Sequence, residues 1–232
     1  MCGRYTIIAR AEEIEKRFNV EVPGSYVPRF NAAPTQILPV ITDAQPDGLS
    51  FFKWGLVPSW AKDKRIGAKM INARSETLSE KASFKQSFKS RRCLVISDGY
   101  YEWKRNSAKS KIPFRIHLCS KEIFAYAGLW DAYTNHDGTT LHTFTIITTR
   151  SNETTAHIHD RMPVMLEEGY EGRWLDQNTG YEELQQLLQP YPNDKIQYYT
   201  VSSLVNKVSN DDVRLVQATA AMDQSGNLTL FD

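Results

Sequence analysis

Ile123-Phe124-Ala125-Tyr126-Ala127-Gly128-Leu129 is one of four short apolar runs that decide the fold of this chain. The other three are Cys93–Ile96, Pro113–Leu118 and Thr143–Thr148. Each run is rich in aromatic and β-branched residues and too short for a typical helix, which favours buried β-strands. We therefore expect strands to dominate the middle of the chain.

The flanking sequence adds further strands and a few brief helices. Apolar runs predict strands at Ile37–Ile41, Leu49–Trp54 and Ile196–Val201. Apolar residues at helical spacing predict helices at Ala11–Phe18, Lys81–Lys89 and Tyr181–Leu188. The polar, basic residues 104–111 predict a solvated loop between two strands. Because strands and helices do not alternate regularly, we predict an α+β fold with a mostly antiparallel, barrel-like β-sheet core and short flanking helices.

The composition limits the class of protein. A chain of 232 residues that is 41% hydrophobic and 24% charged fits one domain over residues 1–232. The formal net charge of +1 excludes a globally basic nucleic-acid binder, although 28 Lys and Arg residues could build a local basic face. We expect no membrane association, because no targeting segment or membrane-length apolar run is found in the sequence.

The cysteines indicate the compartment, and one of them, Cys2, is a candidate nucleophile. Cys2, Cys93 and Cys119 show no paired C-x-x-C spacing, so we expect neither a disulfide framework nor a zinc site, and a reducing, cytoplasmic setting. Loss of Met1 would make Cys2 the N-terminus, with an amine and a thiol on one carbon. An α-amine has a pKa of about 8, so roughly a tenth is free base at neutral pH.

Such an aminothiol can react in two ways, and a structural role is the alternative to both. The amine can form a Schiff base with an aldehyde, which the thiol then closes to a five-membered thiazolidine. Cys2 could equally be an N-terminal thiol nucleophile for amide hydrolysis. The third interpretation is a small buried residue in the first strand, as free cysteines usually are.

Three further polar residues are candidates for chemistry. Asn72 could hold an oxygen or ring nitrogen of a bound intermediate, although spacing alone favours a helix cap. Glu102, flanked by aromatic residues, would suit proton transfer if it were desolvated; the alternative is an exposed hairpin carboxylate. His159 lies beside Asp160 and could act as an acid or base. His157 and His159 lack further matched ligands, so we expect no metal.

Six short strings of residues span nearly the whole chain. They are Met1-Cys2-Gly3-Arg4-Tyr5, Asn31-Ala32-Ala33-Pro34-Thr35, Trp54-Gly55-Leu56-Val57-Pro58-Ser59-Trp60, Ile71-Asn72-Ala73-Arg74-Ser75-Glu76, Asp98-Gly99-Tyr100-Tyr101-Glu102-Trp103-Lys104 and His159-Asp160-Arg161-Met162-Pro163. Together they are similar to the SOS response-associated peptidase family. They occur in that family's order, and six such strings in series make a chance match improbable.

This resemblance implies a sensor of abasic sites in single-stranded DNA. It implies that the protein removes its own Met1, in a cysteine peptidase-like step, and then joins Cys2 to the ring-opened sugar aldehyde as a thiazolidine crosslink. By the same resemblance, Asn72 would hold the sugar and the product ring. Glu102 would assist proton transfer, and His159 would aid sugar opening and reversal, which corresponds to a lyase-type activity.

The resemblance also implies which residues contact DNA. Arg4, Arg74 and Arg161 match positions near phosphates, where an arginine fork pairs well with phosphate oxygens; a structural ion pair is the alternative for each.

Asn31, Pro34 and Trp60 lie in strings that resemble the DNA-contacting wall. The turn around Trp60 favours an exposed indole that could stack on an unpaired base, whereas Trp54 follows a strand and suits the core. The expected partner is abasic single-stranded DNA, bound by a monomer without cofactor or metal, in the cytoplasm and on the nucleoid when bound to DNA.

Three other functions compete with this one. A class II glutamine amidotransferase also begins Met-Cys-Gly, but Arg4 and Tyr5 do not continue that pattern. A noncovalent single-stranded DNA-binding module would use the arginines and aromatics and leave Cys2 structural. A peptidase acting on other proteins is the third, and nothing in the sequence marks a peptide groove.

Overall fold

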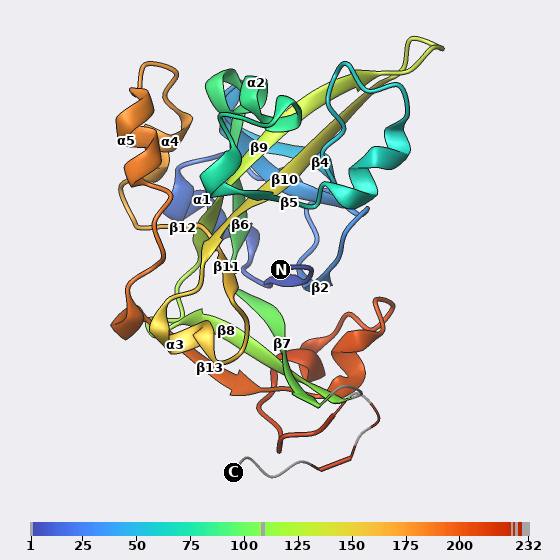
Figure 1. The fold of residues 1–232 in the computed structure, drawn as a ribbon, viewed down its shortest axis with the longest axis vertical. Helices are drawn as coiled ribbons and strands as arrows, with labels where there is room; N and C mark the ends of the chain where they lie inside the picture. Colours follow the sequence, from blue (N-terminus) through green and yellow to red (C-terminus); the bar gives the residue numbers. More distant parts are fainter. Residues whose placement is uncertain (1, 108–109, 224, 226, 229–232) are drawn as a thin grey trace.

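A closed ring of five strands forms the larger part of the fold (Figure 1). The computed structural model describes residues 2–107, 110–223, 225 and 227–228. The ring runs β3-β4-β10-β9-β6 and back to β3. Its strands are β3 (Ile37–Thr42), β4 (Gln45–Trp54), β6 (Arg92–Ser97), β9 (Phe124–Thr134) and β10 (Thr140–Arg150).

One parallel pairing closes the ring, and all other pairings within it are antiparallel. In the parallel contact, Thr143 and Phe144 of β10 lie opposite Lys53 and Trp54 of β4. Three short strands extend the sheet: β5 (Asn72–Arg74) and β11 (Arg161–Pro163) both pair with β10, and β12 (Met165–Leu166) pairs with β9. The predicted barrel-like, mostly antiparallel core is confirmed.

A second sheet of five strands lies beside the barrel and carries the N-terminal strand. Its order is β13-β8-β7-β1-β2. The strands are β1 (Tyr5–Ile7), β2 (Arg29–Ala32), β7 (Gly99–Ser107), β8 (Ser110–Leu118) and β13 (Ile196–Thr200). The β7–β8 ladder reaches Ser107 and Ser110, so residues 104–107 and 110–111 of the expected loop belong to the two strands. Residues 108–109 of that loop lie outside the described residues.

Asp98 joins the two sheets, because it lies between the end of β6 and the start of β7. Its buried carboxylate accepts a hydrogen bond from the Arg115 guanidinium at 2.8 Å and one from the Thr6 hydroxyl at 2.5 Å. The guanidinium lies so close to Gly99 that a Cβ there would be 2.9 Å from Arg115 Cζ. A glycine at this position therefore lets β1, β7 and β8 pack around one buried ion pair.

The helices are short and lie outside the sheets (Figure 1). Helix α1 spans Ala11–Phe18, as the sequence predicts, and α2 (Ala82–Ser90) and α5 (Tyr181–Gln186) differ from the predicted bounds by one or two residues. The remaining α-helices are α3 (Glu153–Ala156) and α4 (Glu171–Leu175), and the 3₁₀ helices are η1 (Lys64–Lys69), η2 (Ser75–Thr77), η3 (Asn193–Lys195), η4 (Ser203–Asn206) and η5 (Val213–Val216).

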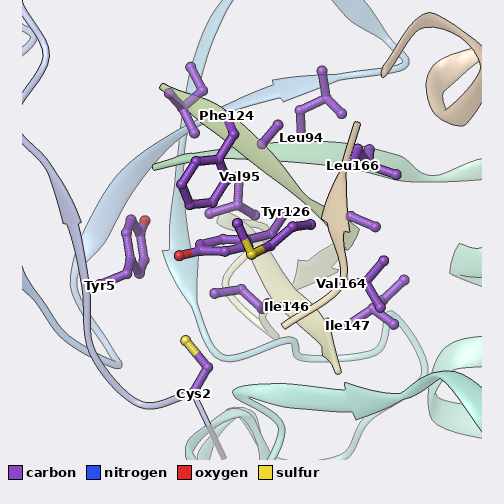
Figure 2. Packing of buried hydrophobic residues seen from close by; sticks show 14 of the residues in the cluster. Cys2, Tyr5, Leu94, Val95, Phe124, Tyr126, Ile146, Ile147, Val164 and Leu166 are labelled. Carbon is purple, nitrogen blue, oxygen red and sulfur yellow. The ribbon is translucent and has the colours of Figure 1, made fainter. Parts of the chain in front are cut away.

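One continuous apolar core fills the barrel and the space between the two sheets. Trp54 is fully buried and packs against Tyr5, with ring centroids 5.3 Å apart, and against Phe144 at 6.2 Å. Tyr5 also packs edge-on against Tyr126 of β9 at 6.0 Å (Figure 2). Strand β1 is thereby fixed against the barrel, which determines where the residues preceding it lie.

Two observations bear on compartment. No helix among the described residues is long and apolar enough to cross a membrane. All three cysteines are free thiols: Cys2 and Cys93 are buried, and Cys119 is exposed.

Candidate active site and DNA-contacting surface

Cys2 is buried at the junction of the two sheets. It precedes β1, is 0% exposed, and belongs to the same packed cluster as Tyr5, Tyr126 and Ile146 (Figure 2). Burial raises the pKa of the Cys2 thiol well above its usual range, and the charge of Glu102 raises it further. Cys2 is thus buried, as its structural interpretation requires, but it carries a neutral thiol beside a carboxylate rather than lying within a strand.

Glu102 reaches the neighbourhood of Cys2 through the pairing of β7 with β1. Tyr5 lies opposite Tyr100, and the Tyr101 N–H donates to the Arg4 carbonyl at 3.0 Å, so the antiparallel register runs on towards Gly3 and Glu102. Glu102 is only 4% exposed. The exposed-hairpin interpretation of this carboxylate is therefore wrong.

Asn72 lies at the start of β5, and its amide is buried without a hydrogen-bond partner. Its backbone pairs in parallel with Ile146 of β10, and the Trp54 indole donates to the preceding carbonyl of Ile71 at 2.8 Å. Among the described residues, neither Oδ1 nor Nδ2 of Asn72 has a hydrogen-bond partner. The helix-cap interpretation is wrong, because Asn72 begins a strand. A buried amide held in place but left unsatisfied is a ready receptor for a polar ligand.

His159 lies in the turn between α3 and β11 and is half-buried. Its Nδ1 accepts a hydrogen bond from the Arg161 N–H at 3.0 Å and is also 2.9 Å from Asp160 Oδ1. These two contacts exclude each other, because Nδ1 accepts only when unprotonated and pairs with the carboxylate only when protonated. We favour the Arg161 contact, since the Asp160 side chain is 87% exposed and screened by solvent.

The fold brings these four residues in from two directions. Cys2 and Glu102 come together through β1 and β7, whereas Asn72 and His159 come from the strands on either side of β10. Ile146, the residue opposite Asn72, belongs to the same packed cluster as Cys2. Figure 2 shows Ile146 near Cys2, so Cys2 lies between the start of β1 and the part of β10 that pairs with β5.

The three arginines expected to contact phosphates differ in their burial and in whether they form an ion pair with an acidic side chain. Arg74 is exposed and forms no ion pair within the described part of the chain. Arg161 forms a fork with Glu76, with N–O distances of 2.5 and 2.9 Å, and this pairing lowers the pKa of the Glu76 carboxyl. Arg4 is half-buried and lines a cavity of about 270 Å³ with Trp103.

The two indoles of the Trp54–Trp60 string lie in opposite environments. Trp54 is fully buried, whereas Trp60 is 59% exposed, as the sequence predicts for both. The Ser59 N–H donates to Asp131 Oδ2 at 3.0 Å, which anchors the turn that presents Trp60. Pro34 is half-buried in the loop before β3. The surface at Trp60 can therefore offer an aromatic face to an unpaired base.

Asn31 is held in the fold by its amide nitrogen. It is 1% exposed, and its Nδ2 donates to the carbonyls of Val205, Lys207 and Asn210 at 3.2, 3.2 and 2.9 Å. These donors hold the segment around η4 against β2, while Oδ1 has no hydrogen-bond partner among the described residues. Asn31 thus anchors the fold, and its contact with DNA stays a prediction.

The sequence reasoning missed three tyrosines around Cys2. Tyr5, Tyr100 and Tyr126 are buried, and Tyr5 and Tyr100 both pack edge-on against Tyr126, at 6.0 and 6.3 Å. Figure 2 shows Tyr5 and Tyr126 in the cluster that contains Cys2. Burial raises the pKa of each tyrosine, and the charge of Cys2 raises it further. A signal was present for Tyr100, because it lies two residues before Glu102 and alternate residues of a strand face the same side. Within the described ranges, no cluster of His, Cys, Asp and Glu could hold a metal ion.

Comparison with known proteins places this arrangement in a family. The model of the SOS response associated peptidase (SRAP) family matches residues 1–208. The chain belongs to this family. A Bacillus subtilis SRAP relative, the abasic site processing protein YoqW, is 48% identical over 94% of this chain and all of its own length. The abasic site processing protein HMCES of Xenopus tropicalis is 32% identical over 87% of this chain and 69% of its own.

Solved structures share the fold of this chain. A Bacteroides thetaiotaomicron protein is 29% identical and superimposes with a TM-score of 0.83 over 94% of this chain and all of its own. A Bordetella bronchiseptica protein, at 24% identity and a TM-score of 0.75, covers 87% of this chain and all of its own and shares the fold.

Proposed function

We propose that this SRAP protein recognises abasic sites in single-stranded DNA and captures them covalently through Cys2. The names of its relatives, abasic site processing proteins, support the substrate class. The observation that carries the covalent part is a buried Cys2 thiol beside the Glu102 carboxylate, near the N-terminus of the chain. Removal of Met1 by the protein itself is part of the proposal, and Met1 lies outside the described residues.

The proposed reaction joins one aldehyde to the two nucleophiles of Cys2. The free amine adds to the aldehyde carbon of the ring-opened sugar, and loss of one water gives a Schiff base. The thiol then adds to the same carbon. Its proton goes to a base while the imine nitrogen takes up a proton, so that the thiazolidine forms with no net change beyond the lost water.

The environment of Cys2 suits this order of events. Because burial and Glu102 keep the thiol neutral, the free amine is the better first nucleophile. The thiol then needs a base when it attacks, and Glu102 is the buried carboxylate close enough to raise its pKa. We propose that Glu102 accepts the thiol proton and passes it on towards the nitrogen.

The other residues would hold the DNA around this centre. The unsatisfied Asn72 amide would bind the opened sugar, and His159 would assist sugar opening and reversal. Arg4, Arg74 and Arg161 would bind phosphates, with Arg161 exchanging its Glu76 partner for DNA. Since the net charge is only +1, affinity should depend on these local charges and fall with added salt.

The competing functions predict different results in two assays, ammonia release from glutamine and survival of the DNA complex in a denaturing gel. A glutamine amidotransferase-type enzyme would release ammonia from glutamine and leave abasic DNA unmodified. A noncovalent binding module would release DNA in a denaturing gel, whereas covalent capture would survive. We also propose that residues 1–232 form one SRAP-like domain and that the protein is a monomer. It would act in the cytoplasm, on the nucleoid when bound to DNA. Light scattering of the free and DNA-bound protein tests the monomeric state.

Asn72→Ala is expected to lower the rate of crosslinking about 100-fold, in the range found for removal of one preorganised hydrogen-bond donor. The melting temperature should stay the same or rise, because the amide has no partner to lose. Asn31→Ala is the matched comparison: it removes three hydrogen bonds and should lower stability by roughly 1–3 kcal/mol. A destabilised Asn72→Ala protein with a normal crosslinking rate would contradict the proposed role.

Trp60→Ala is expected to weaken binding of undamaged single-stranded DNA by about 5- to 150-fold, which corresponds to roughly 1–3 kcal/mol for one stacked base. Fluorescence anisotropy at fixed salt measures this. Tyr181→Ala is the control, because Tyr181 is also exposed, at 55%, but lies on α5. Equal affinities for the two variants would remove Trp60 from the proposed surface.

A further inference from the structure

Tyr100 carries a buried hydroxyl group that the proposed function has not used. Tyr100 lies on β7 and is 1% exposed, and within the described residues its hydroxyl oxygen has no hydrogen-bond partner. Buried tyrosine hydroxyls usually find a partner, because an unsatisfied one destabilises the fold. A phenylalanine would fill the same space without that loss, so the hydroxyl calls for an explanation outside folding.

One side of Tyr100 faces the reactive pair. Tyr100 and Glu102 are alternate residues of β7 and so lie on the same face of the strand. Burial raises the pKa of Tyr100 well above its usual range, and the charges of Glu102 and Cys2 raise it further. Strand geometry therefore puts Tyr100 on the Glu102 side of β7, where its ring packs edge-on against Tyr126 at 6.3 Å. The raised pKa keeps the hydroxyl protonated, which makes it a hydrogen-bond donor rather than a base.

The other side of Tyr100 faces the turn that carries His159. A side-chain interaction with the Thr155 hydroxyl of α3 lowers the pKa of Tyr100, but by less than burial and the charges of Glu102 and Cys2 raise it. The geometry of this contact falls outside that of a hydrogen bond, so the Tyr100 hydroxyl has no hydrogen-bond partner among the described residues. Thr155 donates its own proton to Asn152 Oδ1 at 2.9 Å, and its backbone carbonyl accepts the His159 N–H at 3.1 Å. Tyr100 is thus positioned between the Cys2–Glu102 pair and the His159 turn.

The other two tyrosines around Cys2 do not share this position. Tyr126 shares a hydrogen bond of 2.9 Å with Ser97 Oγ, so its hydroxyl is already used. The Tyr5 hydroxyl is also unsatisfied, but the charges acting on it come from Cys2, Cys93 and Tyr26 and not from Glu102. Of the three, Tyr100 is the one that adjoins both the thiol and the carboxylate.

We propose that the Tyr100 hydroxyl donates a hydrogen bond to an oxygen atom of the abasic sugar and holds its aldehyde carbon between Cys2 and Glu102. This inference rests on the proposed function, since it names a further residue for the same substrate. The bound sugar would supply the hydrogen-bond acceptor that the Tyr100 hydroxyl lacks among the described residues. A sugar oxygen fits, because the opened deoxyribose brings hydroxyl and carbonyl oxygens into the site and Tyr100 can only donate while protonated.

Tyr100→Phe tests this contact, because it keeps the ring and removes only the hydroxyl. Its expected crosslinking rate at saturating abasic single-stranded DNA is about tenfold below wild type, the equivalent of one hydrogen bond. Its melting temperature should equal or exceed that of wild type, and its affinity for undamaged single-stranded DNA should not change.

Tyr101→Phe is the matched control on the next residue of β7. The Tyr101 hydroxyl donates to the Phe30 carbonyl at 2.9 Å on the opposite side of the strand. Tyr101→Phe should therefore lose stability and keep the wild-type crosslinking rate. Tyr100→Phe is thus expected to lower only the crosslinking rate, and Tyr101→Phe to lower only the stability.

The outcomes test the Tyr100 contact separately from the proposed covalent capture of abasic DNA. If wild-type protein crosslinks abasic DNA and Tyr100→Phe crosslinks equally fast, the Tyr100 contact is wrong and the proposed function stands. A lower melting temperature for Tyr100→Phe would mean that the hydroxyl is structural, which also overturns the contact. Failure of the wild-type protein to crosslink would overturn both.

Discussion

Cys2→Ser is expected to reduce the heat-stable crosslink to abasic single-stranded DNA by about a thousandfold or more, as loss of a covalent nucleophile does in other enzymes. The variant is treated with an aminopeptidase, because without the thiol it is not expected to remove its own Met1. The serine then keeps the N-terminal amine and replaces the sulfur with a poorly nucleophilic hydroxyl. The amine should therefore still form a Schiff base, which closes no stable ring. A denaturing gel should show little adduct without reductant, and a clear band when borohydride is present to reduce the imine.

The control for Cys2→Ser is the same substitution at the exposed thiol. Cys119→Ser should crosslink at the wild-type rate, because Cys119 lies on the surface after β8. Both variants need intact masses that demonstrate loss of Met1, since a retained methionine blocks the amine. A Cys2→Ser protein that gives a full yield of heat-stable adduct would show that the linkage does not involve the sulfur.

Glu102→Gln is expected to slow crosslinking by about 10²- to 10⁴-fold, the usual range for loss of a general acid–base group. The crosslinking rate should fall while the rate of alkylation of the Cys2 thiol rises. Glu102 raises the pKa of the Cys2 thiol, so its removal lowers that pKa, increases the thiolate fraction and speeds alkylation of Cys2 by iodoacetamide. The variant should therefore have a more reactive thiol and a slower crosslink.

Another buried carboxylate provides the comparison for Glu102→Gln. Glu171 is 7% exposed and pairs with Arg17 at 2.6 Å, away from Cys2 on α4. Glu171→Gln should lose stability and keep its crosslinking rate. If Glu102→Gln instead loses DNA affinity and melting temperature in proportion to its rate, Glu102 is a folding residue and the proposed proton transfer is wrong.

Strands were predictable from the sequence where they are apolar along their whole length. The predicted strand Cys93–Ile96 lies within β6, and Ile123–Leu129 lies within β9 apart from Ile123. Both segments are buried on both faces and so give a continuous apolar signal. Strands β5 and β11 were missed, since three residues carry no period. Closure of the barrel by the parallel β4–β10 contact was also beyond prediction, because pairing partners depend on long-range packing.

The candidate site shows the same division between local and long-range information. Turn residues predicted the exposure of Trp60, and the preceding strand predicted the burial of Trp54. Nothing local to Asn31 reveals that three carbonyls more than 170 residues away occupy its amide. The burial of Glu102 likewise follows from the β1–β7 pairing, which joins segments almost one hundred residues apart.

The central claim is that the N-terminal aminothiol of Cys2 becomes covalently joined to an abasic site. The most direct measurement is intact mass spectrometry of wild-type protein mixed with abasic single-stranded DNA, followed by mapping of the modified peptide. We predict one adduct, equal in mass to Met1-free protein plus DNA minus one water, formed without reductant and located on Cys2. No adduct from protein proven to lack Met1, or an adduct on a lysine that survives only after borohydride, would contradict this account.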